Sequence, residues 1–180
     1  MTDAPAVLLL HGFATSAART WGENGWLDLL RDTGRTVLAP DLLGHGTAPK
    51  PHDPAAYADL RAGVAEVLPD GPVDAIGFSL GARTLLELAV DRPERFRRLV
   101  VAGVGANLFR RDGSDAIARA LRGEGDTANP TARYFAGLAA HPDVVPAAQK
   151  EVHFFDLNYH RGLDWYRAQF PSGGRLTGEA

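Results

Sequence analysis

One short segment, Val73–Ala82, constrains the fold more than any other part of the chain. It starts with an apolar run, continues through Gly77-Phe78-Ser79-Leu80-Gly81, and leads into a helical pattern that ends near Val90. This order predicts a strand, a tight turn at the serine, and a helix. The glycines occupy positions where a side chain would collide with the neighbouring strand and helix. The segment therefore predicts a sheet whose strands alternate with helices.

Three further apolar runs extend this pattern to a doubly wound α/β sheet. They lie at Ala6–Leu10, at Thr36–Ala39 and within Phe96–Val104. Continuous apolar runs of this length are typical of strands that are buried on both faces of a parallel sheet. Between the runs, the sequence predicts one helix that begins at Trp26 and another that extends over Pro54–Leu68.

Composition limits the function classes that the chain can serve. It has 180 residues with 45% hydrophobic content and a net charge of −3, enough for a domain with its own core. It has no basic block of the kind that binds nucleic acid, and no cysteine for disulfides or thiol chemistry. No apolar stretch approaches the roughly 20 residues of a membrane span, and no basic segment of a secretory signal is visible. We expect a cytoplasmic protein with no membrane or nucleic-acid partner.

Two loops that follow predicted strands carry the next features. His11-Gly12-Phe13 follows the first strand, and Asp41-Leu42-Leu43-Gly44-His45-Gly46 follows the second. The carboxyl ends of parallel strands meet at one edge of the sheet, where ligands of open α/β sheets bind. A serine that attacks a carbonyl group needs two N–H donors for the oxyanion. The backbone N–H groups of Phe13 and Leu80 are the predicted donors; the alternative is an ordinary strand-ending turn with a structural His11.

In order and spacing, these three motifs resemble those of the α/β-hydrolase superfamily over about residues 6–104. The resemblance implies a three-layer, mostly parallel sheet with a core at residues 1–104 and a helical cap at residues 105–170. It implies Ser79 as the nucleophile and the backbone of Phe13 and Leu80 as the oxyanion hole. It also implies hydrolysis of a small-molecule substrate without metal or cofactor. Residues 171–180 are expected to form a loose tail.

The base and the acid that such a serine requires are harder to place. In the family an acid and then a histidine follow the serine, after further strands that this sequence does not show. The candidate bases are His153 and His160, and the candidate acid is Asp143. His45 precedes the serine and is expected to be structural. A sheet that is incomplete after its fourth strand would expose an edge, and this edge predicts a homodimer.

Three functions follow from these features. Ser79 favours a serine hydrolase that acts as an esterase on a small carboxylic ester. A catalytically incomplete protein of the same fold is the alternative, because no clear base follows the serine. The run Trp165-Tyr166-Arg167 is similar to the end of the cap in epoxide-hydrolase-like members. Those enzymes carry aspartate at the position of Ser79, so epoxide opening is the least favoured of the three.

Overall fold

The computed structural model describes residues 4–105, 119–120, 123 and 128–139 of the chain. Within them, four parallel strands form one sheet in the order β2-β1-β3-β4. The strands are β1 (Val7–Leu10), β2 (Val37–Leu38), β3 (Val73–Phe78) and β4 (Phe96–Ala102). All four predicted strands are present, and their parallel pairing confirms the predicted α/β fold class.

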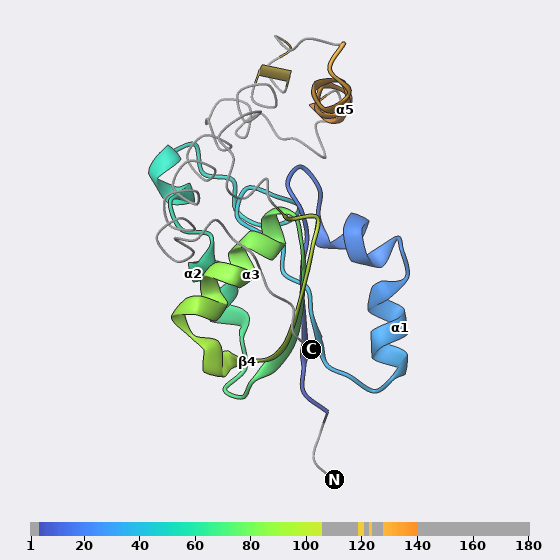
Figure 1. Ribbon diagram of the computed structural model, residues 1–180, viewed down its shortest axis with the longest axis vertical. Helices are drawn as coiled ribbons and strands as arrows, with labels where there is room; N and C mark the ends of the chain where they lie inside the picture. Colours follow the sequence, from blue (N-terminus) through green and yellow to red (C-terminus); the bar gives the residue numbers. More distant parts are fainter. Residues whose placement is uncertain (1–3, 106–118, 121–122, 124–127, 140–180) are drawn as a thin grey trace.

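Helices cover both faces of the sheet (Figure 1). On one face lie α1 (Trp26–Asp32) and the π-helical turn η1 (Ala18–Gly22) that precedes it. On the other face lie α2 (Arg61–Val67) and α3 (Leu80–Asp91), and the short turn η3 (Pro93–Arg95) leads from α3 into β4. The molecule therefore has the three layers that the resemblance implies.

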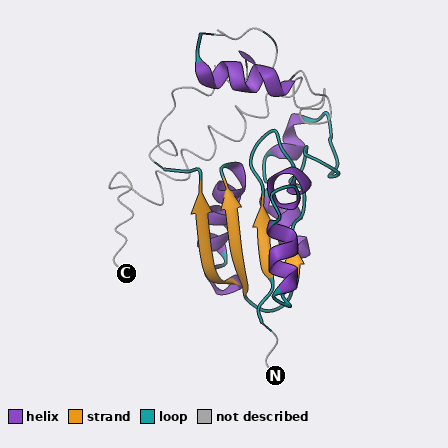
Figure 2. Ribbon diagram, turned by 90° about the vertical axis from the view of Figure 1, so that its right-hand side faces the viewer, coloured by secondary structure: helices purple, strands orange, loops and turns teal. Residues whose placement is uncertain are grey.

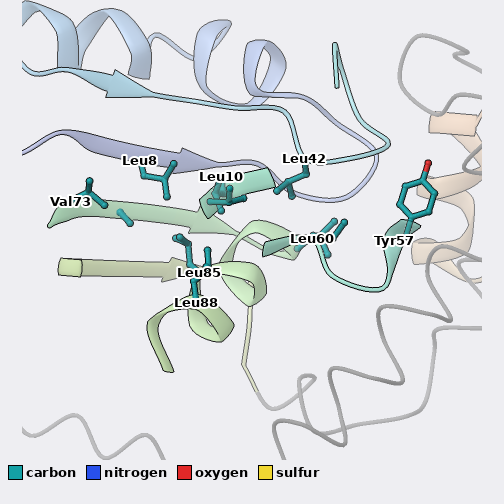
Figure 3. Close-up of a cluster of buried hydrophobic side chains, with 11 residues drawn as sticks. Leu8, Leu10, Leu42, Tyr57, Leu60, Val73, Leu85 and Leu88 are labelled. Atoms are coloured by element: carbon teal, nitrogen blue, oxygen red, sulfur yellow. The ribbon is translucent and has the colours of Figure 1, made fainter. Parts of the chain in front are cut away.

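The residues of β1 explain why both faces need a helical layer. All four are buried. Leu8 and Leu10 pack in a cluster with α2 and α3, whereas Val7 and Leu9 pack with η1 and α1. Successive side chains of a strand point to opposite faces, so a continuous apolar run is stable only where both faces are covered. Figure 3 shows the larger cluster, in which side chains of β1, β3 and α3 meet.

The predicted continuous helix over Pro54–Leu68 is wrong. The segment forms a 3-10 turn, η2 (Pro54–Tyr57), and the separate helix α2. Asp59 accounts for the break, because its carboxylate accepts a hydrogen bond from the Arg61 N–H at 2.9 Å. A short polar side chain that captures a backbone donor in this way competes with the helical hydrogen bond.

A buried carboxylate ties β3 to its neighbours at the amino edge of the sheet. Asp74 of β3 forms ion pairs with Arg35, at 2.6 Å, and with Arg97 of β4. Arg35 also donates to the Pro5 carbonyl before β1. Burial alone would raise the pKa of Asp74, but the hydrogen bonds from Arg97 and Arg35 outweigh it and lower that pKa. This charged group stabilises the end of β3 that is opposite Ser79.

The last described element, α5 (Pro130–Ala139), lies beyond the carboxyl ends of the strands (Figure 2). It falls within the predicted cap at residues 105–170, most of which, like the tail at residues 171–180, lies outside the described residues. β4 is at one edge of the sheet formed by the described strands, and its Val100 is 53% exposed. The homodimer through this edge stays a prediction. None of the described helices is long and apolar enough to cross a membrane.

Candidate functional site

Ser79 lies in the tight turn between β3 and α3. Its backbone has φ 51° and ψ −110°, a combination that residues with a side chain rarely adopt. The Ser79 N–H donates to the Ala102 carbonyl of β4 at 2.8 Å, and the Ser79 carbonyl accepts from the Arg83 N–H at 3.1 Å. These bonds hold the half-buried serine between the end of the sheet and the first turn of α3.

Close contacts explain the two glycines of the motif. A Cβ on Gly77 would lie 2.7 Å from the nitrogen and Cα of Ala82, and a Cβ on Gly81 would lie 2.4 Å from the Leu10 carbonyl oxygen. Backbone atoms at such distances leave no space for a side chain. Gly77 therefore lets α3 turn back against β3, and Gly81 lets α3 start directly beside the end of β1.

The loop after β1 lies beside the serine. A Cβ on Gly12 would lie 3.5 Å from the Ser79 Cβ and 3.0 Å from the Phe78 ring. The structure thus brings the His11-Gly12-Phe13 motif beside the Gly77–Gly81 motif, although the two are more than 60 positions apart in the sequence. Leu80 is the first residue of α3, so its N–H belongs to the first turn, where a helix supplies no internal acceptor.

Two residues at this place have unfavourable backbone conformations. Within the described ranges, Ala14 (φ 55°) and Ser79 (φ 51°) are the non-glycine residues with positive φ. Each such residue costs about 1–3 kcal/mol, and residues of this kind cluster at functional sites. Ala14 follows Phe13 directly, so the strain in both turns lies next to the predicted oxyanion donors. The sequence carries no signal for the conformation of Ala14, because an alanine does not by itself favour positive φ.

His11 connects the loops that follow β1 and β2. Its Nε2 accepts from the Leu42 N–H at 3.0 Å, and its Nδ1 donates to the Gly12 carbonyl at 2.7 Å. These two bonds together require the neutral ring. Burial lowers the pKa of His11, although the Gly12 bond and Asp41 act in the opposite direction. The 3.5 Å approach of Nε2 to the Asp41 carboxylate is therefore not an ion pair.

Asp41 forms a second connection between the same loops. One carboxylate oxygen accepts from the Ala17 N–H at 2.7 Å, and the other accepts from the N–H and hydroxyl of Thr47. Burial would raise the pKa of Asp41, but these donors outweigh it and lower that pKa. Gly46, with φ 46°, leaves the space that this carboxylate fills. The glycines of the motif were a sequence signal for this close approach, but the partner across 24 positions was not predictable.

His45 lies in contact with Phe13, on the buried side of the loop that follows β2. It is fully buried, its Nδ1 donates to the Leu43 carbonyl at 3.1 Å, and its ring centroid lies 5.1 Å from that of His11. Phe13 packs on the His45 ring edge-to-face at 5.7 Å. Burial above all lowers the pKa of His45 to about 3. A histidine that stays neutral in this way supports the Phe13 loop rather than exchanging protons.

The remaining predicted site residues lie outside the described part of the chain. They are His153, His160 and Asp143. Of the predicted set, the structure brings Ser79, Leu80 and Phe13 to one edge of the sheet. In the described part of the chain, no group of three or more histidine or acidic side chains is arranged to hold a metal ion.

The motifs, their order and the strand topology agree with a comparison against protein-family models. The model for the alpha/beta hydrolase fold matches residues 5–136. This chain belongs to the α/β-hydrolase family. A solved esterase from Exiguobacterium antarcticum superposes on this α/β hydrolase with a TM-score of 0.62 over 91% of the chain and 70% of the esterase, at 19% identity. This likeness shows the fold.

Two relatives illustrate the range of names in the family. A pimeloyl-[acyl-carrier protein] methyl ester esterase of Neisseria meningitidis is 39% identical over 115 residues, which are 60% of this α/β hydrolase and 40% of the relative. A 2-hydroxymuconate semialdehyde hydrolase of Pseudomonas sp. is 38% identical over 88 residues, 46% of the chain and 31% of the relative. The chain spans less than half the length of the curated relatives it matches.

The buried histidines predict a loss of stability of this α/β hydrolase in weak acid. With a pKa of about 3 in the folded state and 6.5 as the ordinary value, His45 favours the folded state fully above pH 6.5. This contribution is lost as pH falls from 6.5 toward 3, by up to about 1.4 kcal/mol per pH unit, because the unfolded chain binds the proton first. Urea unfolding at several pH values measures the slope.

Two variants separate the contribution of His45 from the effect of acid on the stability of the whole protein. His45→Gln is expected to reduce the pH dependence of the unfolding free energy between pH 6.5 and 5. The reduction should approach the effect of one bound proton, about 1.4 kcal/mol per pH unit. Leu29→Ala, which changes an exposed residue without a titratable group, is expected to leave the slope unchanged. An unaltered slope in His45→Gln would contradict the assignment.

Proposed function

We propose that this α/β hydrolase is a serine hydrolase that cleaves a small carboxylic ester, with Ser79 as its nucleophile. The observation that carries the proposal is the backbone of Ser79, held at φ 51° between Gly77 and Gly81. A serine on such a turn projects its hydroxyl away from the sheet. The N-terminus of the following helix favours negative charge beside it. The names of the two relatives support hydrolysis, and that of the Neisseria meningitidis relative supports an ester as the substrate.

In the proposed reaction, the Ser79 oxygen attacks the ester carbonyl carbon while a base takes the hydroxyl proton. The electron pair of the carbonyl bond moves onto oxygen, where the N–H groups of Leu80 and Phe13 stabilise the charge. The intermediate expels the alcohol, which receives the proton from the base. A water molecule, deprotonated by the same base, then attacks the acyl-serine, releases the acid and restores Ser79.

The proposed base is His153 or His160, oriented by Asp143, on the grounds of sequence order. The buried histidines do not suit this role. Burial lowers the pKa of His11, and both of its ring nitrogens form hydrogen bonds to the backbone. A pKa of about 3 leaves His45 a weak proton acceptor at neutral pH.

We also propose that residues 105–170 cover the site as a helical cap. The contact that supports this is between α5 and the loop beside Ser79, where the ring centroids of Phe135 and Phe13 lie 5.9 Å apart. A helix that packs on the Phe13 loop in this way would limit the space for a substrate, which favours a small one.

A fluorophosphonate probe tests the proposed nucleophile. It phosphonylates serines that a neighbouring base activates, so the folded protein is expected to be labelled on the peptide that contains Ser79. Digestion and mass spectrometry locate the label, and heat-denatured protein is the control for unspecific reaction. A folded protein that takes up no label would contradict the proposal and would favour a catalytically incomplete member of the family.

A further inference from the structure

Two aromatic side chains are neighbours in sequence of groups at the proposed nucleophile, and α5 adds two more rings that are linked to one of them. Phe13 belongs to the loop after β1, Phe78 directly precedes the serine, and Tyr134 and Phe135 belong to α5. The Phe135 ring centroid lies 5.9 Å from that of Phe13 and 5.4 Å from that of Tyr134. These four side chains, here called the aromatic rim, come from three separate segments of the chain.

Phe78 is held in place although almost half of it is exposed. A Cβ on Gly12 would lie 3.0 Å from one edge of its ring, and a Cβ on Gly103 would lie 2.8 Å from the other edge. The two glycines thus let the backbone contact the ring on both sides, while 45% of the residue stays exposed. A fixed and exposed phenyl group that directly precedes the proposed nucleophile is a surface on which a ligand can pack.

Packing of α5 on the core does not account for the whole rim. The contact between Phe135 and Phe13 docks the helix, and Ala132 of the same helix is buried. Tyr134 lies one position away in the helix, edge-to-face on Phe135, and is 64% exposed. Its ring therefore extends the aromatic surface outward without adding to the docking of α5.

One member of the aromatic rim, Phe13, packs on an uncharged histidine ring. His45 packs edge-to-face under Phe13 at 5.7 Å, and its pKa of about 3 keeps it neutral at physiological pH. A neutral support of this kind favours an uncharged group above it, because an ionised ligand would lose hydration without gaining a partner charge from His45.

We propose that the aromatic rim binds an aryl group of the substrate, so that the preferred esters carry an uncharged aromatic group next to the ester carbonyl. This rests on the proposed serine hydrolase, since Phe13 supplies one predicted oxyanion donor and Phe78 directly precedes Ser79. Aromatic rings attract one another in offset and edge-to-face arrangements beyond the effect of buried area, and rings from three segments offer such partners.

Binding can be tested separately from hydrolysis in the full-length Ser79→Ala variant. Methyl 4-fluorophenylacetate is titrated and its fluorine resonance followed by NMR, and methyl butanoate is added as a competitor. The aryl ester is expected to bind at least about tenfold more tightly than the butanoate, which corresponds to the attraction of one or two aromatic pairs. Wild-type rates for the same two esters are measured as released acid.

Substitutions in the rim locate the binding. In the Ser79→Ala background, Phe78→Ala and Tyr134→Ala are each expected to weaken binding of the fluorinated ester by about three- to tenfold. Tyr134 is mostly exposed, so its replacement leaves the core intact. Leu29→Ala is the matched control, because Leu29 is 60% exposed on α1, which lies on a face of the sheet rather than at its carboxyl edge. This control is expected to bind the ester with unchanged affinity.

The outcomes separate the two proposals. Equal affinity for both esters, or unchanged affinity in both rim variants, overturns the aryl site even if the wild-type protein hydrolyses esters. Tight binding of the aryl ester that is lost in the rim variants supports the site, whatever the rate. If the wild-type protein binds the aryl ester in this way but hydrolyses neither ester, the aromatic rim stands and the serine hydrolase proposal fails.

Discussion

Replacing Ser79 by alanine is expected to lower kcat for a preferred ester by about 10⁴-fold or more. The hydroxyl supplies the bond that forms in the first step, and no other group in the proposed reaction can take its place. The remaining rate would come from the oxyanion donors alone. Initial rates of acid release over a range of ester concentrations measure the effect, because a loss of the nucleophile lowers kcat with little change in KM.

Ser16→Ala is a matched control for the loss of a hydroxyl. The Ser16 hydroxyl accepts a bond from the Arg19 N–H at 3.2 Å in the loop that leads to η1. Its replacement is expected to leave kcat within about twofold, since the loss of one weak cap affects stability by only about 1 kcal/mol. Equal rates in wild type and Ser79→Ala would show that the nucleophile is another group.

A comparison of Ser79→Gly with Ser79→Ala tests the strain itself. Both variants lack the hydroxyl, but only glycine adopts φ 51° and ψ −110° without steric cost. Ser79→Gly is therefore expected to be more stable than Ser79→Ala by about 1 kcal/mol in urea unfolding, after the larger entropy loss of glycine is deducted. Lower stability of the glycine variant would show that the turn is not strained.

The described part of the fold was largely predictable because its signals are local. The clearest case is β1, a continuous apolar run that needs a helical layer on both faces. The expected burial is wrong for β4, because Arg97 and Arg98 interrupt its apolar run and none of its residues is buried. The turn at Ser79 was predictable from local signals too, since Gly77 and Gly81 mark the two close contacts within five residues. The helix over Pro54–Leu68 failed because one carboxylate, Asp59, captures the N–H of Arg61.

The hydrogen bonds that connect the loops of the site were not predictable, because they join residues far apart in the sequence. The bond from Leu42 to His11 spans 31 positions, and the bond from Ala17 to Asp41 spans 24. No pattern within one segment reveals such a pair. Likewise, Ala14 has positive φ only because its neighbours in space require it. The sequence motifs therefore indicated which loops meet, whereas their connections required the structure.

Gly81→Ala is expected to destabilise the protein by about 3 kcal/mol, although alanine is the better helix former. Gly81 is the second residue of α3, and helix propensity alone predicts a gain of about 1 kcal/mol on replacement. The added Cβ would instead lie 2.4 Å from the Leu10 carbonyl oxygen and 2.6 Å from that of His11. These are backbone atoms at the end of β1, which cannot move without disturbing the pairing of β1 with β3.

Gly63→Ala is the matched control, because Gly63 lies inside α2 and a Cβ there would meet nothing within 4 Å. Helix propensity should act alone at this position and raise the free energy of unfolding by up to about 1 kcal/mol. Opposite signs for the two glycine-to-alanine changes in urea unfolding are the expected result. Since the same contact sets the distance between α3 and the loop beside Ser79, Gly81→Ala should also slow fluorophosphonate labelling of the folded fraction. A stabilised Gly81→Ala variant would show that α3 and β1 are farther apart than this geometry requires.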